Sequence, residues 1–311
     1  MRDLGNGIYC LDANYVAESV ASIYLLVENQ KACVIETGSS HSVPSIKQGL
    51  EAIGLGFDDV EYVIATHIHL DHAGGAGTLM QLCPNAKFIV HPRGAWHMIN
   101  PEKLQAGTKA VYGEEKFAKL YGELIPIEEE RVISADDEYR LDFHGRELLF
   151  LDTPGHAMHH FCIYDAKSEG IFTGDTFGVA YPQLSSSNGE TFIFATTTPV
   201  HFDPDAMLSS IDRLMTLNPK KMYLTHFCAI EPTESVITRL KASLNAFVTL
   251  AKELPATEDR VDRIEDGILD WLLAGLAEND CGLSIEEKKR VLAMDAKLNA
   301  QGIEVWLQRY L

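Results

Sequence analysis

The sequence lacks the features that direct a chain to membranes, nucleic acids or secretion. Its 311 residues contain no apolar run of membrane-spanning length, and the segment after Met1 has no apolar core for a signal peptide. Asp and Glu outnumber Lys and Arg by 45 to 26, and the resulting net charge of −19 disfavours nucleic-acid or anionic-membrane surfaces. We therefore expect a cytoplasmic protein with neither a nucleic-acid nor a membrane partner.

The cysteines also lack a disulfide or zinc-ribbon pattern. The six are far apart and form no CxxC pair: Cys10, Cys33, Cys83, Cys162, Cys228 and Cys281. Most lie in apolar runs, which predicts reduced, buried thiols. Internal repeats and low-complexity stretches are absent too, so the length allows one main domain with a smaller one beside it.

Short apolar runs dominate the first two thirds of the chain, and helical patterns dominate the rest. Strands are expected near residues 8–12, 21–27, 32–35, 60–65, 87–90, 131–133, 139–141, 147–151, 161–164, 170–173 and 221–225. Helices are expected near 42–53, 77–83 and 204–217, in an insert at about 93–125, and near 234–254, 260–276 and 284–298. We therefore divide the chain into a domain over 1–232 and a C-terminal helical region over 233–311.

A histidine-rich stretch follows the apolar run that ends at Ala65. His67, His69 and Asp71 share one parity, so an extended segment would point all three to the same side. His72 breaks the parity and needs a turn in the backbone to face a second ion. The small residues after it, 73–75, allow that turn. Clusters of this composition mark metal or catalytic sites.

Three later apolar runs also end directly before ligand-type residues. They lead to His156, Asp175 and His226. Sites commonly form at such strand exits. Together with the first stretch this gives five imidazoles and two carboxylates, which exceed the needs of one tetrahedral ion but suit two ions that share a bridge.

This ordered set resembles the metallo-β-lactamase superfamily of metallo-hydrolases, and the long insert with a helical tail is similar to its PqsE-like subgroup. The resemblance implies an α/β, four-layer αββα sandwich with the metals at one edge, followed here by a C-terminal helical extension. It implies that His67, His69 and His156 hold one metal ion, that Asp71, His72 and His226 hold the other, and that Asp175 bridges them. Many members have Asp where this chain has Glu36, for which we expect a hydrogen bond to a ligand histidine or its loop.

The expected activity is hydrolysis of a small ester, thioester or lactone by a hydroxide that bridges two divalent ions. Zinc fits the ligand set best, with iron or manganese as alternatives. We assign Asp71, Asp175 and Tyr181 to catalysis, Tyr181 as an oxyanion donor. His160 is a candidate to support a ligand, whereas His159 is expected at the surface or in a turn. Trp96 and Trp271 are expected to pack the insert against the tail.

Other functions stay open at this level. A mononuclear iron persulfide dioxygenase would use only His67, His156 and Asp175, and a phosphodiester or phosphotriester hydrolase would use the full set. A third alternative is a protein with an intact metal site that binds a partner through its tail. In the hydrolase and dioxygenase alternatives the expected partner is a small-molecule substrate. The apolar tail helices could also form the interface of a homodimer.

Overall fold

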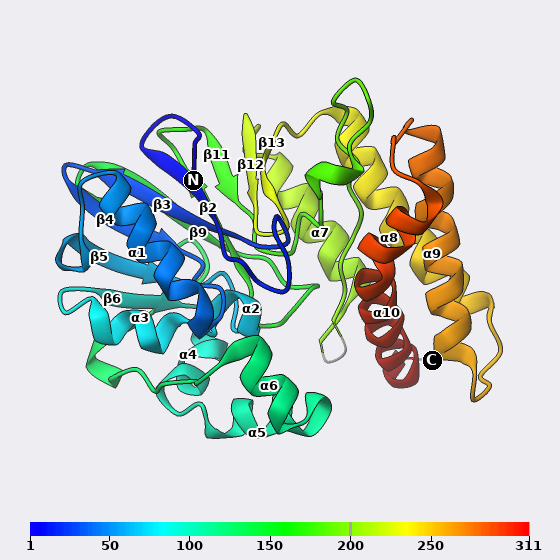
Figure 1. Cartoon of the computed structure of the whole chain (residues 1–311), viewed down its shortest axis with the longest axis horizontal. Coiled ribbons are helices and arrows are strands. Elements are labelled where there is room, and N and C mark those ends of the chain that lie inside the picture. Colours follow the sequence, from blue (N-terminus) through cyan, green and yellow to red (C-terminus); the bar gives the residue numbers. More distant parts are fainter. Residues whose placement is uncertain (199–200, 311) are drawn as a thin grey trace.

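Two β-sheets lie face to face between layers of helices in the computed structural model, which describes residues 1–198 and 201–310 (Figure 1). The seven-stranded sheet has the order β1 (Arg2–Asp3), β2 (Ile8–Asp12), β3 (Ser22–Glu28), β4 (Lys31–Ile35), β5 (Val60–Ile64), β6 (Lys87–Val90) and β7 (Val132–Ser134). The six-stranded sheet has the order β13 (Cys228–Ile230), β12 (Lys221–Leu224), β11 (Gly170–Phe172), β10 (Phe161–Asp165), β9 (Arg146–Asp152) and β8 (Arg140–Phe143). The short strands β1 and β13 were not predicted.

Strand alternation explains why the sheets are covered on both faces. On β3, Tyr24 and Leu26 belong to the core between the two sheets, whereas Ile23 and Leu25 belong to the core under the helices. Helices α1 (Val43–Ala52) and α3 (Ala76–Leu82) supply the apolar side chains of that second core. Helix α7 (Pro204–Met215) packs on the six-stranded sheet. The predicted four-layer αββα sandwich is therefore confirmed.

Short helical turns complete the connections. They are α2 (Leu70–Ala73), η1 (Ser40–Ser42), η2 (Phe57–Asp59), η3 (Glu129–Arg131) and η4 (Pro182–Leu184). The insert forms α4 (Pro92–Ile99), α5 (Glu102–Tyr112) and α6 (Glu114–Tyr121), as its pattern predicts. Phe117 and Tyr121 of α6 share a small buried cluster with Leu70 of α2. The insert is thereby attached to the helix that carries two of the candidate metal ligands.

The C-terminal region consists of α8 (Glu234–Glu253), α9 (Arg260–Glu278) and α10 (Ile285–Tyr310). Helix α10 begins with a capping box, in which Ser284 N donates to Glu287 Oε2 at 2.9 Å and Glu287 N donates to Ser284 Oγ at 3.3 Å. Its expected end near residue 298 was wrong. The helix continues through Gly302, because packing against the chain near Thr197 offsets the low helix propensity of glycine.

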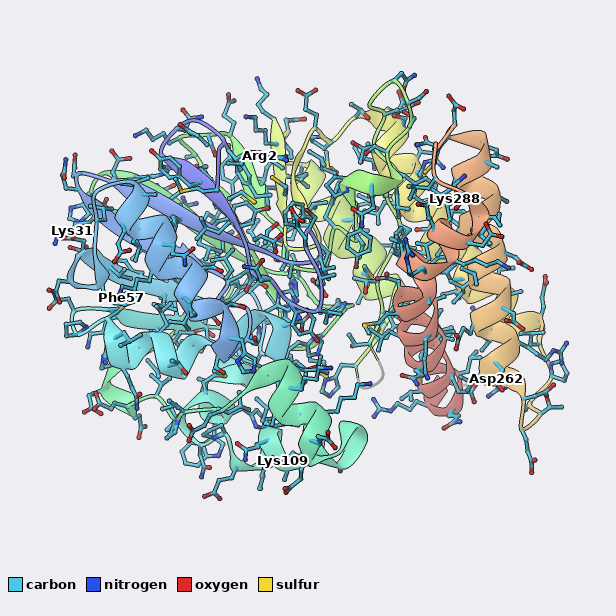
Figure 2. All side chains as sticks on the ribbon, viewed as in Figure 1. Arg2, Lys31, Phe57, Lys109, Asp262 and Lys288 are labelled. Carbon is cyan, nitrogen blue, oxygen red and sulfur yellow. The ribbon has the colours of Figure 1, made fainter. Side chains whose placement is uncertain are left out.

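The expected role of the two tryptophans was also wrong. Trp96 is 60% exposed, and Trp271 packs inside the tail with its ring 5.5 Å from that of Phe247. Figure 2 shows Lys109 of the insert and Asp262 of the tail on separate outer surfaces of the molecule. The six cysteines are free and buried, as predicted. None of the helices in the described ranges is long and apolar enough to cross a membrane.

Candidate metal centre

All seven predicted ligand residues meet at one edge of the two sheets. His67 and His69 follow β5, His156 follows β9, Asp175 follows β11, and His226 follows β12. Asp71 and His72 lie on α2. These side chains are assembled from segments that are far apart in the sequence, so the site depends on the packing of both sheets.

The parity argument holds only for the first two histidines. The segment that leaves β5 stays non-helical through His69, but α2 begins at Leu70. Asp71 therefore reaches the site from a helical turn and not from an extended strand. The same turn brings His72 inward, where its side chain is fully buried. The backbone turn that His72 needed is thus the start of a helix.

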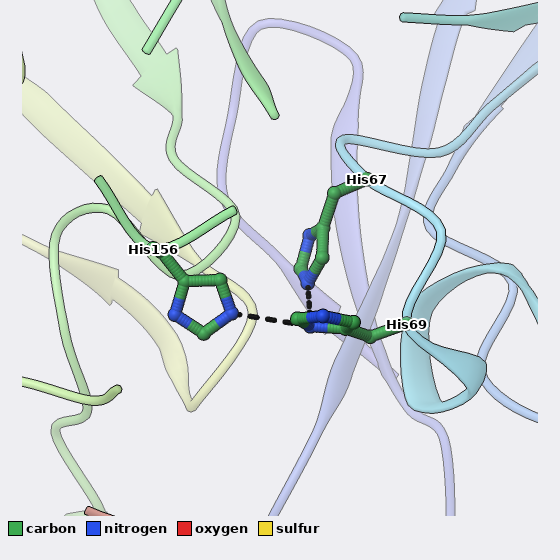
Figure 3. A group of neighbouring side chains, drawn as sticks. All are labelled: His67, His69 and His156. Atoms are coloured by element: carbon green, nitrogen blue, oxygen red, sulfur yellow. Dashed lines mark hydrogen bonds between the residues drawn. The ribbon is translucent and has the colours of Figure 1, made fainter. Parts of the chain in front are cut away.

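One half of the centre is formed by three imidazoles. His67 Nε2 lies 2.7 Å from His69 Nδ1, and His156 Nε2 lies 3.2 Å from the same His69 atom (Figure 3). The ligand atoms of these histidines all lie within 4.8 Å of one another. Three convergent ring nitrogens at this spacing match the donor set of a zinc-type site.

The other half contains the two carboxylates. Asp71 Oδ2 lies 3.6 Å from His226 Nε2, and Asp175 Oδ1 lies 3.2 Å from His72 Nε2 and 3.5 Å from His226 Nε2. The second oxygen of Asp175, Oδ2, lies 3.3 Å from His156 Nε2 in the first half. Asp175 therefore presents one oxygen to each half of the cluster.

Within the described residues, two candidate ligand atoms in this cluster are buried without a hydrogen-bond partner. They are His72 Nε2 and Asp175 Oδ1. Buried polar atoms in folded proteins are nearly always satisfied, so an orphaned pair of this kind needs an explanation. A cation between them would supply it, because both atoms have lone pairs that a metal ion accepts. The residues present therefore fit a bound metal ion.

Backbone carbonyl groups set the tautomers of two ligand histidines. His226 Nδ1 donates to Val20 O at 2.7 Å, and His156 Nδ1 donates to Thr196 O at 3.3 Å. Each donation places the ring proton on Nδ1 and leaves Nε2 as a lone-pair donor that faces the cluster. Neither carbonyl partner was predicted, because both lie in loops far from the histidines in sequence.

Glu36 connects the two halves of the cluster through hydrogen bonds on the side of the rings that faces away from the centre. Its Oε1 accepts from His72 Nδ1 at 3.1 Å, from Thr225 Oγ1 at 3.1 Å and from Thr66 Oγ1 at 2.5 Å. Thr66 Oγ1 in turn lies 3.1 Å from His67 Nδ1 and accepts that ring proton. The expected hydrogen bond from Glu36 to a ligand histidine is present. The threonines were missed, although Thr66 and Thr225 each directly precede a ligand histidine.

Two further histidines surround the cluster. His160 Nε2 accepts from the backbone N–H of Asp175 at 3.1 Å, and its Nδ1 donates to Thr153 Oγ1 at 2.8 Å, so it supports the backbone that presents Asp175. His159 lies in a turn, one of the two places expected for it, and is half-buried with its ring 5.5 Å from that of His69. Burial lowers the pKa of His159 to about 3, which keeps it neutral beside the cluster.

The electrostatics keep the cluster in states that attract cations. Burial, reinforced by the neighbouring imidazoles, holds the pKa of His67 and His69 well below the usual value. Burial would raise the pKa of Asp175, but the imidazoles around it hold that pKa well below its usual range. Burial would lower the pKa of His72, but the neighbouring carboxylates, Asp175 above all, hold that pKa well above its usual value. A proton and a metal ion therefore compete for His72.

Tyr181 lies beside the cluster and donates its hydroxyl proton to Asp295 Oδ1 at 3.2 Å. Burial, together with the Asp295 carboxylate, holds the pKa of Tyr181 well above its usual value, so the phenol keeps its proton. Asp295 lies on α10 and was not predicted. No local pattern marks it, because its approach depends on how the tail packs.

The sequence pattern of the metallo-beta-lactamase superfamily matches residues 17–226. The chain belongs to the metallo-beta-lactamase superfamily. The fold agrees, since the structure of the metallo-beta-lactamase family protein TTHA1429 from Thermus thermophilus superposes with a TM-score of 0.66 at 21% identity and covers 99% of this chain and 95% of that one. Fold, superfamily and a metal-type His/Asp cluster thus point to the same class of protein.

The curated relatives include one named only for its fold and others named as a hydrolase or a lactonase. Metallo-beta-lactamase fold-containing protein ST1585 from Sulfurisphaera tokodaii is 25% identical over 231 residues, 73% of this chain and 80% of its own. Hydroxyacylglutathione hydrolase from Prochlorococcus marinus is 24% identical over 220 residues, 68% of this chain and 66% of its own. N-acyl homoserine lactonase from Bacillus thuringiensis is 26% identical over 178 residues, 57% of this chain and 59% of its own.

Proposed function

We propose that the protein is a cytoplasmic, dinuclear metal-dependent hydrolase that acts on a small-molecule ester, thioester or lactone. The observation that carries the proposal is the placement of Asp175, whose two oxygens lie 3.2 Å from His72 Nε2 and 3.3 Å from His156 Nε2. A carboxylate shared in this way is suited to bridge two cations. The hydrolase and lactonase names among the relatives support hydrolysis as the reaction class. The choice of an ester, thioester or lactone as substrate goes beyond those names and is part of the proposal.

The ligand assignment follows the two halves of the cluster. His67, His69 and His156 would hold one ion, and Asp71, His72 and His226 would hold the other, with Asp175 between them. Imidazole-rich sites with a bridging carboxylate suit zinc best, and iron or manganese also fit. When bound, the two ions would supply a hydroxide near pH 7 and stabilise developing negative charge on the substrate.

The protein's own groups set the geometry for this chemistry. Glu36 and the carbonyls of Val20 and Thr196 hold three ligand rings with Nε2 directed inward. Asp175 and Asp71 bring negative charge that favours cation binding. No protein nucleophile is required in this arrangement. Tyr181 stays in the proposal as an oxyanion donor, and in that role its hydroxyl proton would turn from Asp295, which accepts it here, to the substrate.

Metal analysis combined with a substrate panel tests the proposal. We expect about two ions per chain, activity on a thioester, ester or lactone, loss of that activity with a chelator, and its return with Zn²⁺, Mn²⁺ or Fe²⁺. Phosphodiesters and phosphotriesters serve as the contrasting substrates. One iron per chain with oxygen consumption on a persulfide would instead indicate a dioxygenase. Activity indifferent to chelation would overturn the proposal.

A further inference from the structure

The tail helix α10 brings a carboxylate to the metal centre. Asp295 Oδ1 accepts from Tyr181, and the residue before Tyr181, Ala180, donates its backbone N–H to His226 O at 2.5 Å. Asp295 is therefore connected to the candidate ligand His226 through two hydrogen bonds, one made by Tyr181 and one by its neighbour Ala180. Figure 1 shows α10 beside the loop that leaves β11 and contains Tyr181. The tail thus contributes a side chain to the site and does more than cover it.

The packing of α10 fixes where this carboxylate lies. Gly302 leaves no room for a side chain, because a Cβ there would lie 2.4 Å from Thr197 Oγ1 and 2.9 Å from backbone atoms of Thr198. Thr197 Oγ1 donates to Asn299 O at 3.1 Å, and Thr198 Oγ1 donates to His156 O at 3.0 Å. The same short segment therefore contacts α10 on one side and a candidate ligand on the other. A rigid attachment of this kind is what discrimination between substrates requires.

The Asp295 carboxylate has more acceptor capacity than the protein fills. An ionised carboxylate offers about four lone-pair sites. Within the part of the chain that the structure describes, Tyr181 is the one side chain that donates to it. One turn along the same helix face, Asn299 Oδ1 is buried and has no donor among the described residues. This face of α10 presents acceptor oxygens in excess of the donors around it.

We propose that Asp295 is a specificity-determining residue that receives a hydrogen-bond donor of the substrate, a hydroxyl or an ammonium group close to the scissile carbonyl. The proposal rests on the hydrolase function proposed above and narrows its substrate class. Asp295 is half-buried, so a bound substrate without a donor would displace water from the carboxylate and leave it without a replacement partner, which disfavours the deoxy analogue. The Tyr181 hydroxyl holds the carboxylate in place from the other side.

The test compares three thioesters of N-acetylcysteamine that differ in one substituent: butyryl, 3-hydroxybutyryl and 3-aminobutyryl. Burial raises the pKa of Asp295 to about 6, so assays at pH 8 keep the carboxylate ionised. For the wild-type protein we expect kcat/KM for at least one donor-bearing substrate to exceed that for butyryl by about tenfold to a hundredfold. In Asp295→Ala this ratio should fall to near one.

Two further variants separate recognition from packing. Asp295→Asn keeps an acceptor oxygen without the charge, so it should retain part of a hydroxyl preference and lose an ammonium preference. Lys297→Ala changes an exposed residue on the same helix and should keep the wild-type ratio. Equal kcat/KM values for all three substrates in the wild-type protein, or an unchanged preference in Asp295→Ala, would overturn the proposal.

A binding measurement keeps this result distinct from failure of the hydrolase function. Butanohydroxamic acid and its 3-hydroxy and 3-amino derivatives are titrated calorimetrically into the zinc-loaded protein and its Asp295→Ala variant. We expect the wild-type protein to bind at least one of the two derivatives about tenfold more tightly than the parent compound and the variant to bind all three equally. If no thioester is hydrolysed, the proposed activity fails while these affinities still decide the role of Asp295. Equal affinities of all three compounds for the wild-type protein would refute that role.

Discussion

Glu36 offers the sharpest test of how the centre is organised, because one carboxylate oxygen serves both halves. Its Oε1 accepts directly from His72 and, through the Thr66 hydroxyl, orients His67. The side chain is 1% exposed, so water cannot readily replace it. We predict that Glu36→Gln weakens metal binding at both positions and affects the His72 half more, since that contact is direct.

The expected size follows from the chemistry of such supporting contacts. Loss of a partner that orients a metal-bound histidine reduces metal affinity by about 10-fold to 100-fold, or about 1.4 to 2.7 kcal/mol. The glutamine keeps the shape and one acceptor oxygen, but its amide nitrogen adds a donor among the groups that donate to Glu36. Glu36→Ala should cost more, because it leaves several buried donors without an acceptor.

Zinc titration against a competing chelator, with metal content measured per chain, checks this prediction. Glu61→Gln is the matched control, because Glu61 Oε2 pairs with His144 Nε2 at 2.8 Å on a more exposed surface. The control should bind both ions with wild-type affinity. If Glu36→Gln did so as well, the histidines would not depend on this carboxylate and the reasoning would be refuted.

Further predictions concern the ligands, the adjoining backbone and the metal. Asp71→Ala or His72→Ala should chiefly empty the second metal position and His67→Ala the first, as measured by metal content; equal loss of both ions from every variant would contradict the assignment. Gly155→Ala should lower the free energy of unfolding by about 2–4 kcal/mol in urea titrations, because its φ is +129° and a Cβ would lie 2.3 Å from backbone atoms of Met207. Gly145→Ala, with φ +86° and open space, should cost only about 1 kcal/mol. Removal of metal by a chelator should lower the melting temperature, and excess zinc should restore it, since an ion that binds only the folded state stabilises it; a melting temperature unchanged by chelation would argue against a bound ion.

The sequence by itself determined the superfamily, the sandwich and the candidate ligands. Ligand atoms are properties of residue types, and strand exits such as those before His156 and His226 can be recognised from local apolar runs. The four layers were expected from the resemblance that these ordered ligands carry, and the alternating burial along the strands agrees with them. Glu36 was predicted as well, from the resemblance, because many members of the superfamily have Asp at this place.

Only the tertiary structure decided which groups stand behind and beside these ligands. The Tyr181 and Asp295 contact joins residues 114 positions apart, and the His226 and Val20 contact joins residues 206 apart. Such pairs depend on how helices and loops pack, and no local periodicity encodes that. The closeness of His159 to His69, 5.5 Å between ring centres, was not predicted for the same reason. The length of α10 was misjudged because tertiary packing around Gly302 overrides its weak helix propensity.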